Sequence, residues 1–595
     1  MARLRRPDSF EDLRGQGLFR AVSASQLLAG QAAILEYGLV GVMGGAGMAY
    51  ARIPTREQVQ EAGRILFDAT AEVEQVDVFI SHTWGSGRWA KFLGLCLYLN
   101  LGRAIKTSLA VWILAIGTLI AVGGLQGYGG SRLLFPVLVC LPAAIFFWVL
   151  LRGHFTPCEV SSTSLWLDKL CIHQTDEELK QRQLAALPIF VARSSRMLVL
   201  WDEMYFERLW CHVELATFAK HGDQHKLDFQ PLWLAPWLVT CLTLELLSAI
   251  VAELCVLVSP TTSNTGELKE FFEGFFADPR TVTFWIYCSL WLASSAIIYL
   301  PIMIPCFLSC QRKLQQHQVM LHQIATFDIK DAKCSLAEDR LLLEQQVQEL
   351  FCTHGMEAEA ETATIQVDEP EPDSSAHRAE EWEPVTHAVV PRGVHGDALH
   401  RFNAYVRGPL HDAVLEQMGS ELYIPWHICM AALLPDVLYS AVNILGCDNG
   451  TCQTSAAEAG FASVEGYMAT QLLAWILCLM LSIPISYPAL LHMIQLAMKI
   501  GAGPLQSLVA MLCCPLAYAY SNACSGVIWG CLYCLALDYS QAWLTGFLLF
   551  LALLTLHFWL LFLRQEGQER SAASCRCVRR QVNTLPRVSE HTSLL

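Results

Sequence analysis

The chain has 595 residues, of which 54% are hydrophobic and only 16% are charged. This composition excludes an ordinary soluble protein, because such proteins carry about 25% charged residues. The net charge of −15 at pH 7 argues against nucleic acid as a partner, since binding to phosphates requires a basic surface. The lipid bilayer is the expected partner.

Apolar runs long enough to cross a membrane occur throughout the chain, since a span needs about 20 mostly apolar residues. Eight segments qualify, namely residues 107–124, 133–151, 233–258, 282–309, 424–445, 467–490, 505–535 and 542–563. The run at 505–535 is long enough to hold one helix or two. Lys and Arg flank the spans on the side that carries both termini, which predicts a multi-pass membrane protein with both termini in the cytosol. The compartment stays open.

Between the spans, the sequence predicts soluble segments. They are an N-terminal cytosolic segment (1–54), two halves of one α/β domain (55–104 and 153–234) around a transmembrane hairpin (105–152), transmembrane helices three and four (235–309), a cytosolic helical and partly disordered segment (310–423), transmembrane helices five to eight (424–563) and a cytosolic tail (564–595).

The first half of the α/β domain begins with an expected helix over residues 55–73, which opens on a capping box formed by Thr55 and Gln58. An expected strand, 76–81, follows, and a glycine-containing turn then leads into a helix over 88–103 that runs toward the first span. The alternation of helix and strand predicts a parallel sheet with helices on both faces.

The second half continues the same alternation. Its expected elements are strands at 164–172, 196–200 and 227–234, a helix opened by a capping box at Thr175 and Glu178, and a helix over 207–220. Beyond the fourth span, helices are expected over 311–351 and over 397–418, the latter interrupted before Pro409, while 356–390 lacks the apolar content to fold.

Three pairs of cysteines give further expectations. Cys447 and Cys452 flank the glycosylation sequon at Asn449 and are expected to form a short disulfide on the oxidising side. Cys575 and Cys577 in the basic tail could be acylated or could stay unmodified. Cys531 and Cys534 have zinc-like spacing inside an apolar run, so helix packing is favoured there and no metal site is expected.

Three motifs carry a resemblance to a known family. Residues 76–82 (VDVFISH) resemble the first box of TIR (Toll/interleukin-1 receptor) domains, and residues 205–215 (YFERLWCHVEL) are similar to the family's Trp-Cys-x-x-Glu-Leu helix. Residues 166–174 (WLDKLCIHQ) resemble a signature of the related heterokaryon-incompatibility (HET) family. The resemblance implies a flavodoxin-like α/β domain, here split by the hairpin, and a role in signalling.

In TIR domains that cleave NAD, the glutamate of the Trp-Cys-x-x-Glu helix is catalytic, and the motif places it at Glu214. The resemblance implies that NAD is a substrate and that no prosthetic group is needed. One carboxylate suits this reaction, because an anion can stabilise the positive charge that develops on ribose during cleavage. The alternative is a solvated helix carboxylate in a non-enzymatic scaffold. The cofactor-binding candidates are Phe79, Ser81, His82, Trp84, Asp168 and Trp210.

Several of these residues also have structural interpretations. Trp166 and Trp210 are the type of residue that fills a core, Asp168 could cap a loop, and Asp77 would hold the strand start. The loop that often drives TIR assembly is short here, so a homo-oligomer would depend on confinement in the membrane.

Two acids inside predicted spans support a different function. Glu245 lies in the third span and Asp436 in the fifth, where a carboxylate costs about 2.5–3.5 kcal/mol on insertion scales. Such groups usually face a partner, a cavity or an ion path. The sequence therefore leaves open a channel or transporter that is regulated by its cytosolic domain.

Overall fold

The computed structural model describes residues 10–48, 54–123, 133–155, 163–221, 226–258, 261–334, 337–352, 392–447, 451–500 and 504–563. The expectations for 356–390, Asn449, Cys575 and Cys577 lie outside these residues. The chain forms two compact units. Unit 1 consists of Met1–Tyr98, His154–Leu232 and Val319–Ala413, and unit 2 of Leu99–Gly153, Trp233–Gln318 and Val414–Leu595.

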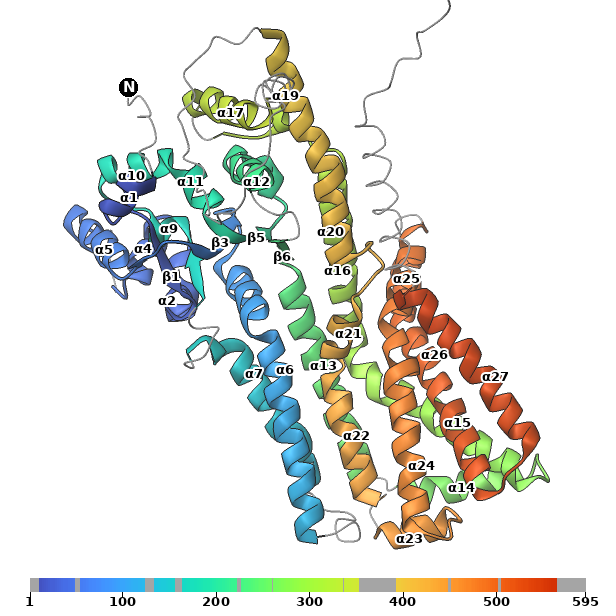
Figure 1. Ribbon diagram of the computed structural model, residues 1–595. Coiled ribbons are helices and arrows are strands. Elements are labelled where there is room, and N and C mark those ends of the chain that lie inside the picture. Colours follow the sequence, from blue (N-terminus) through green and yellow to red (C-terminus); the bar gives the residue numbers. More distant parts are fainter. Residues whose placement is uncertain are drawn as a thin grey trace, which may run out of the picture. The chain divides into compact units, whose positions relative to one another are not determined.

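Unit 1 is built on a six-stranded mixed sheet with the order β2-β1-β4-β3-β5-β6 (Figure 1). The strands are β1 (Arg20–Ser23), β2 (Ala71–Glu72), β3 (Val76–His82), β4 (Ser164–Trp166), β5 (Ser194–Trp201) and β6 (Leu227–Pro231). Four of them, β4, β3, β5 and β6, are parallel as expected. The N-terminal segment supplies β1, which pairs antiparallel with β2 and β4, so an all-parallel sheet was wrong at this edge.

Two predicted strands end early. The strand expected over 164–172 stops at Trp166, because Asp168–Cys171 turns into the short helix α9. The strand expected over 227–234 stops at Pro231, and α13 begins at Leu234. In both cases a buried apolar run fits a strand and a helix equally well by composition.

Side-chain caps mark the start of two helices of unit 1, α5 and α10. Thr55 and Gln58 form the predicted capping box of α5 (Arg56–Asp68). The box expected at Thr175 is wrong, because Asp176 caps α10 (Glu177–Ala185) by accepting from the N–H groups of Glu178 and Leu179. Further along, α11 (Leu187–Ala192) precedes β5 and α12 (Leu209–His221) follows it.

The chain segments before and after the hairpin insertion pair as β3 and β4, and the Asp77 side chain adds hydrogen bonds to this junction. Asp77 on β3 accepts hydrogen bonds from the backbone N–H and the hydroxyl of Ser164 on β4, at 2.7 and 2.9 Å. In return, the Ser164 hydroxyl lies 2.8 Å from the backbone N of Asp77. The predicted structural role of Asp77 is therefore confirmed.

Most of the segment 310–423, which was expected to be cytosolic, helical and partly disordered, belongs to unit 1. The helix expected over 311–351 is two helices, α16 (Met303–Ala325) and α17 (Ala337–Phe351). Helix α17 packs on α12 and on α19 (Arg392–Tyr405). Between α16 and α17, Phe327 contacts the rings of Phe206 and Phe402. The break expected before Pro409 is a π-helical turn, Val406–Leu410, which leads into α20 (His411–Met418).

Among the described residues, seven helices are long and apolar enough to cross a membrane, or eight if one bent pair counts as a span. They are α6 (Arg88–Gly123), Pro136–Phe155 with α7 (Leu141–Arg152), α13 (Leu234–Val258), α15 (Pro279–Tyr299), Val464–Met498 with α24 (Val464–Leu477) and α25 (Ser486–Met498), Leu512–Leu537 in α26 and Gln541–Phe562 with α27 (Gln541–Phe558). The bent pair is α21 (Trp426–Ala432) and α22 (Leu434–Gly446), which meet at 56°. The run at 505–535 forms one helix, α26 (Pro504–Leu537).

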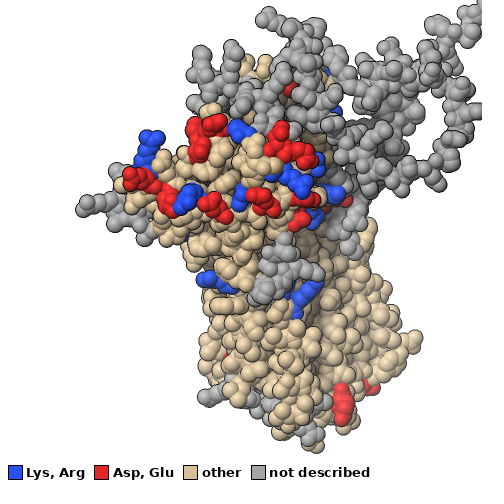
Figure 2. All heavy atoms as spheres, turned by 60° about the vertical axis from the view of Figure 1, so that its left-hand side comes forward, with Lys and Arg blue, Asp and Glu red and all other residues tan. Residues whose placement is uncertain are grey.

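The outer faces of these helices are apolar. Ile113 and Leu114 on α6 and Leu549 and Leu553 on α27 are all exposed. On the face drawn in Figure 2, charged side chains gather on the sheet-containing unit, while the helical unit shows few. Exposed apolar surface of this extent is typical of contact with lipid rather than water.

Two further features of unit 2 fit the composition. Gly526 and Gly530 lie one turn apart on α26 and face α15, where an added Cβ would come within 2.9 Å of the Cys288 backbone and 2.8 Å of the Phe284 ring. Small residues at this spacing let membrane helices approach closely. The expected disulfide between Cys447 and Cys452 is also present.

Removing the Asp77 carboxylate should loosen the junction of β3 and β4. Asp77→Ala loses hydrogen bonds to a charged acceptor on an exposed strand end, for which about 1–2 kcal/mol is typical. We expect faster amide hydrogen exchange across 76–82 and 164–166, measured by mass spectrometry. Glu74→Ala, which removes an exposed ion pair with Arg14, is the control and should leave exchange at these strands unchanged.

Candidate functional site

The candidate site lies where the parallel strands end. Ser81 is near the carboxyl end of β3, Asp168 follows β4 and Asp202 follows β5. The register places Ser81 opposite Val199 and Phe79 opposite Trp166, so all three strands end along one edge. In parallel α/β sheets, ligands bind outside this edge, where neighbouring connections leave in opposite directions.

A hydrogen-bonded group of three side chains joins β3 to α12. The Ser81 hydroxyl donates to Glu214 Oε2 at 2.5 Å and lies 2.8 Å from the Tyr205 hydroxyl. Ser81 and Tyr205 are fully buried, whereas Glu214 is half-buried. The Glu214 carboxylate therefore accepts a hydrogen bond from the neutral Ser81 hydroxyl, and part of the residue is exposed.

The surroundings of Glu214 favour its protonated form. Burial raises its pKa to about 8, and the charge of Asp168 adds to this, while the hydrogen bond from Ser81 and the charge of Arg208 act in the opposite direction. A hydroxyl donor supplies no full positive charge to offset desolvation. The carboxyl group is thus able to hold or release a proton near neutral pH.

Trp84 organises the second part of the site. Its indole N–H donates to Asp168 Oδ2 at 3.0 Å, and the His82 ring meets it edge-on at 4.3 Å. Two ammonium groups lie over its face, Lys169 Nζ at 4.0 Å and Lys91 Nζ at 5.3 Å from the ring centroid. Cations are attracted to this face of an indole ring.

Burial also shifts the charged groups beside Trp84. The pKa of Asp168 is raised to about 6 by burial, although hydrogen bonds from Lys169 and Trp84 oppose the shift. The pKa of Lys169 is lowered to about 8, again chiefly by burial. Burial and the nearby ammonium groups hold the pKa of His82 well below its usual range, so its ring is neutral.

Several polar atoms in this part of the site are buried and have no hydrogen-bond partner among the described residues. They include Lys91 Nζ, His82 Nε2 and the Ser86 hydroxyl. Lys91 is 0% exposed, and an unsatisfied buried donor costs about 1–3 kcal/mol, more when it is charged. Ser86 stands at the start of α6, where the free N–H groups of the first turn also favour an anion. Donors of this kind around one loop point to an anionic ligand.

The structure separates the predicted site residues into two groups. Ser81, His82, Trp84, Asp168 and Glu214 lie together at the strand ends.

Phe79 does not reach this edge, because its ring is 0% exposed and stacks on Trp166 at 4.5 Å in the core. Trp210 is half-exposed on α12, and no described residue forms a hydrogen bond or ring contact with its indole.

Three residues at the site escaped sequence reasoning. Tyr205 opens the TIR-like motif, but nothing in the motif shows that its hydroxyl meets Ser81. Lys91 and Lys169 look like ordinary surface lysines in the sequence. Their burial over Trp84 depends on the path of α6 and α9, for which the local sequence carries no signal.

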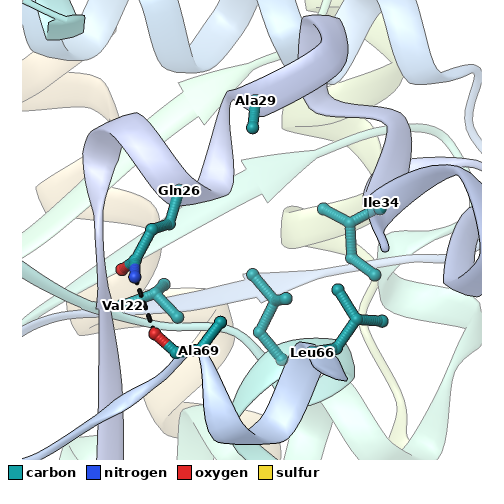
Figure 3. A pocket seen from close by; sticks show the side chains of 8 residues that line it. Val22, Gln26, Ala29, Ile34, Leu66 and Ala69 are labelled. Atoms are coloured by element: carbon teal, nitrogen blue, oxygen red, sulfur yellow. Dashed lines mark hydrogen bonds between the residues drawn. The ribbon is translucent and has the colours of Figure 1, made fainter. Parts of the chain in front are cut away.

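An apolar hollow lies elsewhere in unit 1, between β1 and α5 (Figure 3). Its volume is about 150 Å³, below the 300–1,000 Å³ typical of ligand sites. Its lining residues are Val22, Gln26, Ala29, Ile34, Gly45, Leu66, Ala69 and Leu170. The Gln26 amide donates to the Ala69 carbonyl and accepts from the Ser23 N–H, so both of its polar atoms already have a protein partner.

His173 has a capping role. It stands where the HET-like pattern has asparagine, and its ring accepts a hydrogen bond from the Asp176 N–H at 3.0 Å.

The last observations concern metals and known proteins. Within the described part of the chain, His, Cys, Asp and Glu form no group of three or more with the geometry of a metal site. No family model, curated protein or solved structure matches the chain.

The raised pKa of Glu214 should make unit 1 less stable as the pH rises. The folded state binds the Glu214 proton between about pH 4.5 and 8 while the unfolded state has released it, so stability falls with pH across this window. Glu214→Gln should therefore flatten the fall in thermal unfolding temperature between pH 6 and 9. Glu178→Gln, at an exposed position on α10, should keep the wild-type slope, and an equal slope in both variants would contradict the assignment.

Proposed function

We propose that unit 1 is a TIR-like signalling domain that cleaves NAD to nicotinamide and an ADP-ribose product, with Glu214 as the catalytic carboxylate. The observation that carries the proposal is the hydrogen bond between Ser81 and Glu214. It joins the two motifs that resemble TIR domains, at the edge where a dinucleotide would bind. The order of the parallel strands, β4-β3-β5-β6, supports a flavodoxin-like arrangement, whose first four strands follow the order 2-1-3-4.

The chemistry requires one anion beside the ribose. The bond between ribose C1′ and the nicotinamide nitrogen breaks, its electron pair leaves with nicotinamide, and positive charge develops on the sugar. The Glu214 carboxylate stabilises this charge and accepts a proton from the water that attacks C1′. The products are nicotinamide, ADP-ribose and a proton. A cationic ring beside Glu214 favours the ionised carboxylate that this step needs.

The donors around Trp84 supply the binding part of the site. Lys91, Ser86 and the start of α6 suit the phosphates of the dinucleotide, and the half-buried Trp84 indole suits a base or nicotinamide ring. Ser81 is buried, and its role in this proposal is to orient the Glu214 carboxylate through their hydrogen bond.

We further propose that the helical unit anchors this domain to a membrane with both termini in the cytosol. Support comes from the apolar outer faces of α6 and α27 and from the disulfide at Cys447, which would lie on the opposite, oxidising side. Confinement to a plane would raise the effective concentration of copies and favour a homo-oligomer.

The enzymatic proposal predicts nicotinamide release from NAD by the full-length protein in liposomes. Glu214→Gln should lower kcat by about 100-fold or more, the loss typical when an electrostatic stabiliser is removed. Glu178→Gln is the matched control. In the wild type, kcat/KM should rise with pH through about 8 as Glu214 loses its proton, and the variant should lose this limb. Equal rates for wild type and Glu214→Gln would overturn the role of Glu214.

Sidedness provides a second readout of the same assay. With the protein in the plasma membrane of intact cells, NAD added outside should remain uncleaved until the cells are permeabilised. Cleavage before permeabilisation would contradict the proposed orientation while leaving the chemistry in place.

The phosphate-binding role of Lys91 predicts a different kinetic signature. Lys91→Met keeps the length of the side chain but removes the ammonium group, so KM for NAD should rise about tenfold, equivalent to about 1.4 kcal/mol, while kcat changes less. Lys180→Met on α10 is the control and should leave both constants unchanged. A fall in kcat alone would show that Lys91 does not bind the substrate.

The alternative is a non-enzymatic scaffold with the same fold. It predicts that wild-type protein binds NAD or ADP-ribose, detected by calorimetry, without releasing nicotinamide at any protein density. The partly exposed Glu214 beside a neutral Ser81 is compatible with binding alone, so the absence of product from densely reconstituted protein would favour the scaffold.

A further inference from the structure

Unit 2 contains two carboxyl groups from separate helices, one fully buried and one half-buried. Glu245 lies midway along α13 and is 0% exposed, and Asp436 lies in the first turn of α22. The two are far apart in sequence, but an electrostatic interaction links them in the folded unit. Helices α13 and α22 pack directly against each other.

The hydrogen bonds of Glu245 leave one of its oxygen atoms unused. Oε1 accepts from the hydroxyl groups of Tyr487 on α25 (Ser486–Met498) and Tyr518 on α26, both at 2.8 Å. Oε2 is buried and has no partner among the described residues. Tyrosine hydroxyls satisfy an oxygen atom without neutralising its charge, so a second species must meet Oε2 if the carboxylate is ionised.

Asp436 shows the same deficiency at a break in a helix. Its Oδ2 is buried without a partner in the described part of the chain. It stands three residues beyond Leu433, where α21 and α22 meet at 56°. Coupling ions in membrane transporters typically bind beside such discontinuous helices.

The side chains that interact with the two carboxyls through hydrogen bonds or electrostatics are phenols and thiols. From the helices around them come Cys241, Tyr299, Cys310, Cys429, Tyr487 and Tyr518. Among the described residues, no Lys, Arg or His forms an ion pair with Glu245 or Asp436. Two carboxylates in a medium of low dielectric cannot both be ionised without a cation between them, so this arrangement retains a proton.

Acidic and phenolic groups continue along the same interface. Tyr439, one turn beyond Asp436 on α22, donates to Glu253 on α13 at 3.4 Å. Glu253 is two turns beyond Glu245 and is half-exposed. Helices α13 and α22 therefore carry a second acidic and phenolic pair, which lies nearer the surface of unit 2 than Glu245.

We propose that Glu245 and Asp436 form an exchangeable proton site on a proton path through the helices of unit 2. The proton moves between carboxyl oxygens and phenolic hydroxyls with no change in oxidation state. This inference does not depend on NAD cleavage, and either proposal can fail while the other holds.

The test uses full-length protein in liposomes that enclose a pH-sensitive dye, with a potassium gradient and valinomycin to impose a membrane potential. We expect proton flux above that of protein-free liposomes, lost in Glu245→Gln and in Asp436→Asn. Glu465→Gln is the control, because Glu465 is an exposed carboxylate in the first turn of α24 (Val464–Leu477). Wild-type flux no greater than that of protein-free liposomes, or flux unchanged in Glu245→Gln, would overturn the path.

Infrared difference spectra between acidic and alkaline buffer separate loss of the site from misfolding. The wild type should show a protonated-carboxyl band that responds to pH, and both variants should alter it while keeping the wild-type elution volume and helical signal. An identical band in wild type and Glu245→Gln would overturn the assignment. Flux that depends on sodium instead of protons would overturn the proton in favour of a metal cation.

Discussion

The structure of unit 1 depends on the parallel pairing of β3 with both β4 and β5. Strand β3 belongs to the segment before the inserted hairpin, whereas β4 and β5 belong to the segment after it. Because β3 is central, its pairing brings Ser81 against Glu214 on α12 and Trp84 against Asp168 after β4. The hydrogen bonds between Asp77 and Ser164 hold the start of the same pairing. Without this central strand, the residues proposed to bind and cleave a dinucleotide would not share a site.

In both units, a carboxyl group with little or no exposed surface accepts hydrogen bonds from neutral hydroxyl groups. Glu214 accepts from Ser81, and Glu245 accepts from Tyr487 and Tyr518. A hydroxyl satisfies the geometry of a carboxylate oxygen but leaves its charge uncompensated, unlike an Arg or Lys partner. Each carboxyl therefore remains responsive to a positive charge that arrives from outside, a developing sugar cation in one proposal and a proton in the other. Asp77 and Asp176 differ in their partners. Their carboxylates accept hydrogen bonds from backbone N–H groups, at the start of a strand pairing and at the start of a helix.

Lys91 and Trp84 give the candidate site a different character from that of a simple acidic pocket. The Lys91 ammonium is fully buried and has no hydrogen-bond partner among the described residues, which is costly in free energy. The face of the Trp84 indole stabilises it in part. Together with Asp168 and Lys169, these groups place both signs of charge within one loop cluster. Such a mixture suits a zwitterionic ligand that carries phosphates and a cationic ring.

The sequence by itself determined the apolar spans, the strand and helix alternation, the capping box at Thr55 and the motif that singles out Glu214, because these depend on residue spacing within a short stretch. It also gave the carboxyls at Glu245 and Asp436 as exceptions in apolar runs. Only the tertiary structure decided that Phe79 lies in the core, that Tyr205 and Lys91 belong to the site, and that the N-terminal strand β1 extends the sheet. These outcomes depend on contacts between residues far apart in the chain, which local patterns of polarity do not encode.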